Sequence, residues 1–377
     1  MDISDSGWRP QFPKEGAGRI ALFQLSRRAI VIIMQLRKRT LAGPFTLHRT
    51  LPRNIRPEEE WIFARELKRE CEGIFLITGK HIMVDVLSGI AISGLSPVKE
   101  SFVSAQAATG YHLARVAMQW LRLAKYREFL YCGPVLLIHD RFCHYYGHWM
   151  TDAVSRTYLA RDYLETHKII LPASYRSHAY KLESLIPFGV SEKHIMYVDS
   201  PVALVKDFAM PSFAGPLWVN PKDEIAQAIR EIYHEHFGLS DSKPKKLVYL
   251  TRMKMGHRHV INEDQVLELL TSKGFEVIVP EDMRLEEQAR LLASTKVLIG
   301  LTGSALNNMM FMHPDSSVIE FRMKDDDQNL HYFSYSSAHQ LKYYYIRCPS
   351  RGDDRFYADF VVDIDLLEET VDMALSN

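Results

Sequence analysis

The stretch RFCHYYGHWMTDAVSR, from Arg141 to Arg156, combines two histidines, a cysteine, an aspartate and two arginines with several aromatic residues. Metal binding, core packing and catalysis each require such residue types. A metal site is disfavoured, because His139, Cys143 and His148 match no helical or zinc-knuckle spacing and no fourth ligand follows. The aromatic residues Tyr146 and Trp149 are expected to pack beneath a helix start.

Catalysis is the third interpretation of this stretch. If a helix begins near Gly147, His148 and Asp152 lie four residues apart on one helix face. An imidazole next to a carboxylate is the usual arrangement of a general base. The pair follows the short apolar run PVLLIHD, which reads as a buried strand. A base at the end of that strand, opposite a bound diphosphate, indicates group transfer from an activated donor to a hydroxyl.

A second group of candidates surrounds VLIGLTGSALNN, Val297 to Asn308, where a buried strand meets small residues and then a helix. The free N–H groups and dipole of a helix start favour an anion. Tight packing alone also explains small residues at such a turn, and neither a P-loop nor GxGxxG is present. The candidates for a phosphate-binding and nucleotide-binding corner are Thr251, Arg252, Arg258, Thr302, Gly303, Ser304, Asn308 and Glu320. Glu320 fits a ribose contact, but equally a pair with Arg322 or Arg252.

The elements that must position these residues alternate between strands and helices. A β–α–β–α–β alternation runs from about Pro134 to Asp199, and a second begins at Lys246, after a Pro-rich and Gly-rich boundary at 210–224. Such alternation predicts parallel sheets covered by helices. The sequence therefore predicts an α/β protein of two doubly wound units, with the site in the cleft between them, outside the carboxyl ends of the strands.

Composition narrows the functional classes. The 377 residues have a formal net charge of +0, which disfavours nucleic-acid binding by overall electrostatics. The four cysteines form no disulfide framework, and with no recognisable signal peptide a cytoplasmic location is expected.

The amino-terminal region departs from this average, since no acidic residue occurs between Glu15 and Glu58. Its apolar run AIVIIMQL is far too short to span a bilayer, which takes about 20 residues. Two interpretations stay open. Residues 17–40 lie peripherally on an anionic membrane surface, at the inner face of the membrane, or the run is a buried first strand.

The motifs resemble glycosyltransferase family 61. YYGHWMTDAVSRTYL is similar to the first motif of that family, Asn-x-x-His-(Trp)-x-x-Asp. The later residues follow the second half of the family pattern in order: the TR of YLTR, a second arginine, Asn-Glu, GF-x-V, Pro-Glu, Glu-Gln and G-x-x-G-x-x-L-x-N. The resemblance covers about Val135 to Tyr345 and points to a bacterial-type member of capsular or exopolysaccharide synthesis.

The resemblance implies an inverting, metal-independent glycosyltransferase of the GT-B fold, with two Rossmann-like domains and no cofactor besides the donor. Its domains would be a basic extension at 1–60, an acceptor domain at 61–215 and a donor domain at 216–377. The donor would be a nucleotide-diphosphate sugar, and the acceptor a glycan or lipid-linked glycan. The family positions matched are His148, Asp152, Arg252, Arg258, Asn262, Gly303, Asn308 and Glu320.

Two positions depart from the family pattern. Tyr145 stands at the asparagine of the first motif, and Thr302 at a histidine that would face the donor phosphates. Asp152 or His148 is expected to be the base, and the favoured assignment is Asp152, with His148 orienting it or the acceptor. The rival hypotheses are an epimerase or hydrolase of nucleotide sugars on the same scaffold, and a degenerate, non-catalytic subunit of glycan assembly, which the loss of the histidine favours.

Overall fold

The structure is a computed structural model that describes residues 36–103, 130–216, 220–351 and 358–376. The chain divides into two compact units, Met1–Ile33 and Met34–Asn377, and all described residues belong to the second. None of the helices in the described ranges has the length and hydropathy that a membrane span requires. The stretch ATGYHLARVAMQWLRLAKYREF at 108–129, whose apolar residues recur at helical spacing, and most of the apolar run at 29–36 lie outside the described residues.

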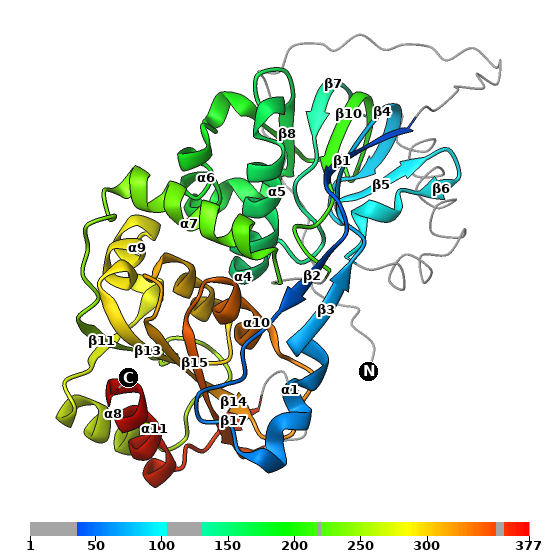
Figure 1. Ribbon diagram of the computed structural model, residues 1–377. Helices are drawn as coiled ribbons and strands as arrows, with labels where there is room; N and C mark the ends of the chain where they lie inside the picture. The colour runs from blue at the N-terminus through cyan, green and yellow to red at the C-terminus, as the bar shows by residue number, and fades with distance from the viewer. Residues whose placement is uncertain (1–35, 104–129, 217–219, 352–357, 377) are drawn as a thin grey trace, which may run out of the picture. The chain divides into compact units, whose positions relative to one another are not determined.

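The first sheet has eight strands in the order β6-β5-β4-β10-β7-β8-β9, with β1 paired to β4 (Figure 1). The predicted β–α–β–α–β alternation is confirmed, because β7, β8 and β9 are parallel neighbours. Strand β10, which the sequence reading missed, joins this parallel part to antiparallel β4. The bounds are β1 Leu36–Ala42, β4 Ile74–Asp85, β5 Ile90–Ser93, β6 Ser96–Pro97, β7 Leu130–Leu136, β8 Lys168–Pro172, β9 Ile195–Val198 and β10 Val202–Pro211.

One segment of this sheet has a longer strand than its sequence suggests. The segment IFLITGKHIMVDVLSG is read as strands around a turn, and in the structure Ile74–Asp85 is one continuous strand with the turn after it, at 86–89. It continues because β10 pairs along it from Leu76 to Asp85, and His81 takes a left-handed conformation with φ of 56° inside the strand. The tertiary pairing thus keeps this long strand continuous through Gly79.

The second sheet is fully parallel, in the order β12-β11-β13-β14-β15. Helices follow its strands as the sequence alternation predicts. The strands are β11 Lys246–Leu250, β12 Glu276–Ile278, β13 Thr295–Leu301, β14 Ser317–Met323 and β15 Lys342–Cys348. The helices are α8 Glu263–Ser272, α9 Leu285–Ala293, α10 His331–Ala338 and α11 Ile364–Ser376. The mixed α/β architecture with parallel strands is thus confirmed.

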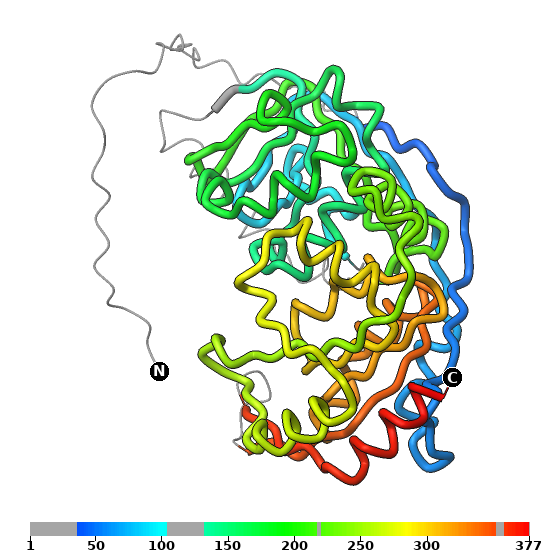
Figure 2. The backbone as a smooth tube through the Cα atoms, turned by 90° about the vertical axis from the view of Figure 1, so that its left-hand side faces the viewer, coloured from blue at the N-terminus to red at the C-terminus, as the bar shows by residue number. Residues whose placement is uncertain are grey.

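Helix α7 (Asp223–Phe237) connects the two sheets along the chain, as Figure 2 traces in green. Its Tyr233 is completely buried and donates a hydrogen bond of 2.7 Å to the backbone oxygen of Ser184. The same ring contacts Phe188 and Phe311 edge-on, so side chains that follow β8 and β13 share one apolar cluster. That shared cluster fixes the first-sheet elements against those of the second sheet.

The segment between β1 and α1 (Glu60–Leu67) contacts the second sheet. Strand β2 (Phe45–His48) pairs with β3 (Lys68–Cys71). Beyond β2, Arg53 N donates to the Tyr343 oxygen at 2.8 Å, and the Asn54 amide exchanges two hydrogen bonds with the Tyr345 backbone. The part of the predicted basic extension that the structure describes is therefore ordered along the fold.

Candidate functional site

The predicted dyad lies on an interrupted helix at the carboxyl end of β7. This helix consists of α4 (Tyr146–His148), a π-helical turn (η3, Trp149–Ala153) and α5 (Val154–Leu159). His148 Nδ1 lies 2.9 Å from Asp152 Oδ2, so the prediction that the two share one helix face is confirmed. A π-helical turn inside a helix is rare and is frequent at functional sites.

Exposure and charge distinguish the two members of the dyad. The side chain of His148 is 20% exposed, whereas that of Asp152 is 7% exposed. Burial lowers the pKa of His148, but the hydrogen bond and charge of Asp152, with the charge of Asp140, raise it above its usual value. The imidazole also stacks on Phe142, with 5.3 Å between ring centroids. Asp152 therefore orients the imidazole of His148 and favours its protonated form. The imidazole lies nearer to solvent than the carboxylate of Asp152.

The neighbours of the dyad are structural, as the packing interpretation predicts. Trp149 is completely buried and donates from Nε1 to Ser184 Oγ at 2.8 Å. His139 is buried with Nε2 at 2.8 Å from the Val86 oxygen, and Cys143 is buried too. Among the described residues, no group of His, Cys, Asp or Glu side chains is placed to hold a metal ion. Tyr145 is 55% exposed.

The second group of candidates occupies the carboxyl edge of the parallel sheet. Thr251 and Arg252 follow β11, and Thr302 and Gly303 follow the adjacent β13. Arg252 fits against Gly303 so closely that a Cβ there would lie 2.4 Å from its Nη1. A side chain at position 303 would therefore displace the guanidinium.

Arg258 reaches the same corner from the following loop. Its Nη1 donates to the Thr302 backbone oxygen at 3.1 Å. Its backbone is left-handed, with φ of 57°, a conformation that costs a non-glycine residue roughly 1–3 kcal/mol and often marks functional sites. The surrounding fold holds Arg258 in this conformation.

The corner carries two guanidinium groups without a carboxylate partner. Burial and the nearby charge of Arg258 lower the pKa of Arg252. Neither arginine forms an ion pair with a carboxylate within the part of the chain that the structure describes, and the Nε of each is buried without a hydrogen-bond partner there. Two neighbouring guanidinium groups beside a glycine suit an anion such as a diphosphate.

The remaining candidates form a layer beneath this corner. Thr251 Oγ1 donates to Glu263, and Thr302 Oγ1 donates to Glu320 at 2.5 Å. Glu320, only 2% exposed, also accepts from Tyr343, and its alternative role as a partner of Arg322 is limited to a charge interaction. The structure places these side chains as supports of the corner, and their contact with a ligand stays a prediction.

The helix expected after Gly303 is present and is a 3-10 helix, η9 (Ser304–Phe311). Its side chains meet the dyad helix directly. A Cβ at Gly147 would lie 2.3 Å from Asn307 Nδ2 and 3.2 Å from Ser304 Oγ. Tyr146 donates to Asn308 Oδ1 at 2.5 Å. The structure thus brings the dyad and the arginine corner together through one tight contact between α4 and η9.

Two residues at the start of α10 were missed by the sequence reading. Tyr332 is buried, and burial raises the pKa of its hydroxyl. The charges of Arg258 and Arg252 act in the opposite direction on this pKa. Burial, together with the charge of His148, lowers the pKa of His331 to about 4. Both follow the carboxyl end of β14, which pairs with β13, so strand order alone indicates that they lie near the edge of the sheet that carries the corner.

Comparison with known proteins locates the resemblance. Residues 146–319 match the sequence model of the family described as Glycosyltransferase 61. The chain is 34% identical over 82 residues to the xylan glycosyltransferase MUCI21 of Arabidopsis thaliana. That alignment covers 21% of this chain and 16% of the relative, so the chain matches a small part of the relative's length. The family resemblance predicted from the motifs is confirmed over the matched range.

Proposed function

We propose that this chain, which matches glycosyltransferase family 61 over residues 146–319, transfers a sugar from a nucleotide-diphosphate donor to a hydroxyl of a glycan acceptor. One observation carries the proposal. A hydrogen-bonded His–Asp pair lies on the interrupted helix that begins with α4, and α4 packs against η9. Arg252 and Arg258, which form no ion pair with a carboxylate among the described residues, contact Gly303 and Thr302 directly before η9. Such an arrangement supplies a base on one side of the reacting carbon and charge neutralisation on the other.

The donor diphosphate would bind at the arginine corner. Arg252 and Arg258 carry the charge there, and Gly303 lets the ligand and the guanidinium approach the backbone. As the bond between the anomeric carbon and the diphosphate oxygen breaks, negative charge grows on the leaving group. Preorganised cations at that oxygen are usually the largest single contribution to catalysis. Since Thr302 replaces a cationic family residue and bonds to Glu320, the two arginines would carry this role alone.

The acceptor hydroxyl would be deprotonated by His148. We revise the expectation that Asp152 is the base, because its carboxylate is the less exposed of the pair and bonds the imidazole. In the step, the acceptor oxygen bonds to the anomeric carbon, its proton passes to His148, and the nucleoside diphosphate leaves. Asp152 stabilises the imidazolium that forms, as the carboxylate of a hydrolase triad does.

Finer features extend the proposal. Inversion of the anomeric configuration and independence from metal follow from a single displacement with a protein base, and a GT-B arrangement of two Rossmann-like domains fits the two sheets. The xylan glycosyltransferase relative supports a polysaccharide acceptor, as in cell-surface polysaccharide synthesis.

A thermal-shift panel of nucleotide sugars, run with and without EDTA, tests donor binding. Stabilisation by one nucleotide sugar in EDTA is expected, because a ligand that binds only the folded state stabilises it.

Peripheral membrane association is a separate part of the proposal. The basic residues within 17–35 would contact anionic lipid, since Leu36–Ala42 is occupied in pairing with β4. Deletion of residues 17–35 should abolish cosedimentation with vesicles that contain 30% anionic lipid, an effect of about 1 kcal/mol per basic residue. Unchanged cosedimentation would contradict this part alone.

A further inference from the structure

Two side-chain amides, Asn308 of η9 and Gln288 of α9, are hydrogen-bonded to each other in the interior of the protein. Asn308 is 1% exposed and Gln288 is 9% exposed. A buried amide costs free energy unless its donors and acceptors are satisfied by hydrogen bonds. The other partners of these two amides therefore indicate what the pair does.

Gln288 is bonded to a backbone loop at its other side. Its Nε2 donates to the backbone oxygens of Pro280 and Met283, each at 3.0 Å, and its Oε1 accepts from Asn308 Nδ2. A side-chain amide has two N–H donors, and both have a partner here. Because a backbone oxygen only accepts, the nitrogen of Gln288 has to face this loop and its oxygen has to face Asn308.

The directions of the other hydrogen bonds follow from that end. Asn308 presents Nδ2 to Gln288, so its Oδ1 faces the hydroxyl of Tyr146, 2.5 Å away. The phenol therefore has to donate its single proton to Asn308. We call these three side chains the amide row. It runs from Tyr146 through the two amides to the backbone oxygens of the loop.

The loop at the end of the amide row lies at the sheet edge that carries the arginine corner. A short 3-10 turn, Pro280–Asp282, follows β12, and β12 pairs in parallel with β11. Thr251, which precedes Arg252 directly after β11, donates from its backbone N to the Ile278 oxygen at 3.0 Å. The loop that Gln288 holds is thus a direct neighbour of the segment that bears Arg252.

The first turn of the dyad helix lies at the opposite end of the amide row. Tyr146 is the first residue of α4 and precedes His148 by two positions. Tyr145, at the N-cap position, forms no side-chain capping hydrogen bond. The next residue, Gly147, lies so close to η9 that a Cβ there would be 2.3 Å from Asn307 Nδ2. Contacts with η9 therefore hold this turn where a capping side chain would ordinarily stabilise it.

We infer that Gln288, Asn308 and Tyr146 are positioning residues, which hold the proposed base at a fixed distance from the arginine corner. The inference rests on the proposed function. The amide row joins the start of α4, η9 and the loop after β12, so it links the segments that carry His148 and Arg252. A displacement of about 1 Å between reacting groups can lower a rate about 100-fold. This role replaces the expected contact of Asn308 with the donor.

The test compares full-length wild type with Tyr146→Phe and Gln288→Met, which remove hydrogen bonds of the row with little change in volume. Tyr233→Phe is the matched control, because Tyr233 is also buried and its hydroxyl donates to a backbone oxygen at 2.7 Å, outside the row. Release of nucleoside diphosphate is measured with an oligosaccharide acceptor and the nucleotide sugar that stabilises wild type. The donor Kd by calorimetry, the pH profile and Tm are recorded for every protein.

In both row variants kcat should fall about tenfold, because the base is no longer held in register with the leaving group. The donor Kd should stay at the wild-type value, because both arginines are intact. The acidic limb of the pH profile should also stay, because the hydrogen bond between His148 and Asp152 is kept. Tyr233→Phe should lower Tm to a similar extent and keep the wild-type kcat.

A lowered Tm with wild-type kcat in both row variants would show that the row is only structural and would overturn the inference. A donor Kd weakened in parallel with kcat would overturn it too, since the row would then serve donor binding. Tyr146→Phe, which removes a single oxygen atom, decides the matter if Gln288→Met does not fold. Absence of sugar transfer by wild type would instead refute the proposed function, and the inference with it.

Discussion

Replacement of Asp152 by asparagine perturbs the dyad with little change in shape. The amide keeps the size of the carboxylate that lies 2.9 Å from His148 Nδ1, but it removes the charge that stabilises the imidazolium. A hydrogen bond to a charged group contributes about 1.5–3 kcal/mol. Because the imidazolium forms as the acceptor proton is transferred, that loss corresponds to a rate decrease of about 10-fold to 150-fold.

The pH dependence gives the same prediction a second readout. Burial lowers the pKa of His148, and Asp152 is the main group that raises it above the usual value. The neutral imidazole is the base, so wild-type turnover should fall as the pH drops through this raised pKa. In Asp152→Asn the burial effect dominates, and the acidic limb should move to lower pH. The His148 pKa can be measured independently by NMR titration of its ring protons.

The stability of the protein should also depend on pH through His148, because folding changes the pKa of this residue. A histidine whose pKa is raised by folding stabilises the protein fully below its unfolded pKa of about 6.5, and this contribution is lost as the pH rises through the folded pKa. The stability gap between wild type and Asp152→Asn should therefore be larger at pH about 5.5 than at pH about 8.5. Chemical denaturation at the two pH values measures that gap.

The control is Asp162→Asn, which changes an exposed carboxylate that follows α5 in the chain. It should leave turnover and its pH profile at the wild-type values. Turnover of Asp152→Asn within twofold of wild type, with an unmoved acidic limb, would refute the assignment of the dyad. In that case the hydrogen bond between the two side chains serves only the packing of the π-helical turn.

Three further predictions concern the arginine corner, the contact between Gly147 and Asn307, and the buried amine of Lys181. Arg252→Ala should weaken binding of the donor nucleoside diphosphate at least tenfold by calorimetry, because a charge-assisted contact is lost. The control Arg290→Ala should leave this affinity unchanged. Equal affinities of the two variants would contradict diphosphate binding at the arginine corner. Gly147→Ala should destabilise the protein by about 1–3 kcal/mol in denaturant titration, since its Cβ would lie 2.3 Å from the Asn307 amide. Gly43→Ala, with nothing within 4 Å, is the neutral control, and equal effects would refute a tight junction. Burial lowers the pKa of Lys181 to about 7, so between pH about 7 and 10 the unfolded chain binds a proton that the folded protein does not. The stability of wild type should therefore rise with pH in this range relative to Lys181→Met. A pH-independent difference in Tm between the two proteins would contradict this prediction.

Hydrophobic patterning predicted most of the second sheet correctly. Apolar runs such as VLIGL and SVIEFR form strands buried on both faces, which is what parallel pairing requires. The spacing of His148 and Asp152 predicted their contact, because four residues return to one face of a helix. The place of Arg252 next to Gly303 could be predicted because both residues follow strands. Neighbouring parallel strands have their carboxyl ends at the same edge of the sheet.

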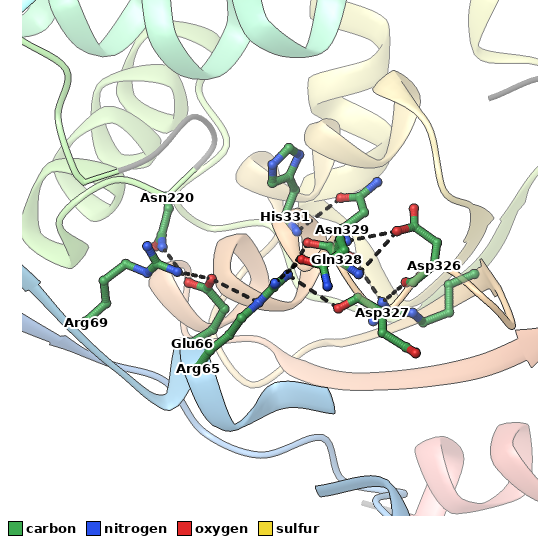
Figure 3. A network of polar contacts seen from close by, with 10 residues as sticks. Arg65, Glu66, Arg69, Asn220, Asp326, Asp327, Gln328, Asn329 and His331 are labelled. Carbon is green, nitrogen blue, oxygen red and sulfur yellow. Dashed lines mark hydrogen bonds and ion pairs between the residues drawn. The ribbon is translucent and has the colours of Figure 1, made fainter. Parts of the chain in front are cut away.

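The features that sequence reasoning missed depend on contacts between distant segments. A hydrogen bond joins Arg65 to Gln328, which is 263 positions away (Figure 3), and no local pattern reveals such a contact. The π-helical turn at Trp149–Ala153 has the same composition as an ordinary helix and differs only in its hydrogen bonding. The exposures that favour His148 over Asp152 as the base depend on what packs over each side chain.

The central claim is transfer of a sugar from a nucleotide sugar to an acceptor hydroxyl. Mass spectrometry of an oligosaccharide acceptor, incubated with the stabilising nucleotide sugar and the protein, tests it most directly. The account predicts that the acceptor gains the mass of one sugar residue for each nucleoside diphosphate released. Release of nucleoside diphosphate with an unchanged acceptor, or conversion of the donor to its epimer, would contradict it.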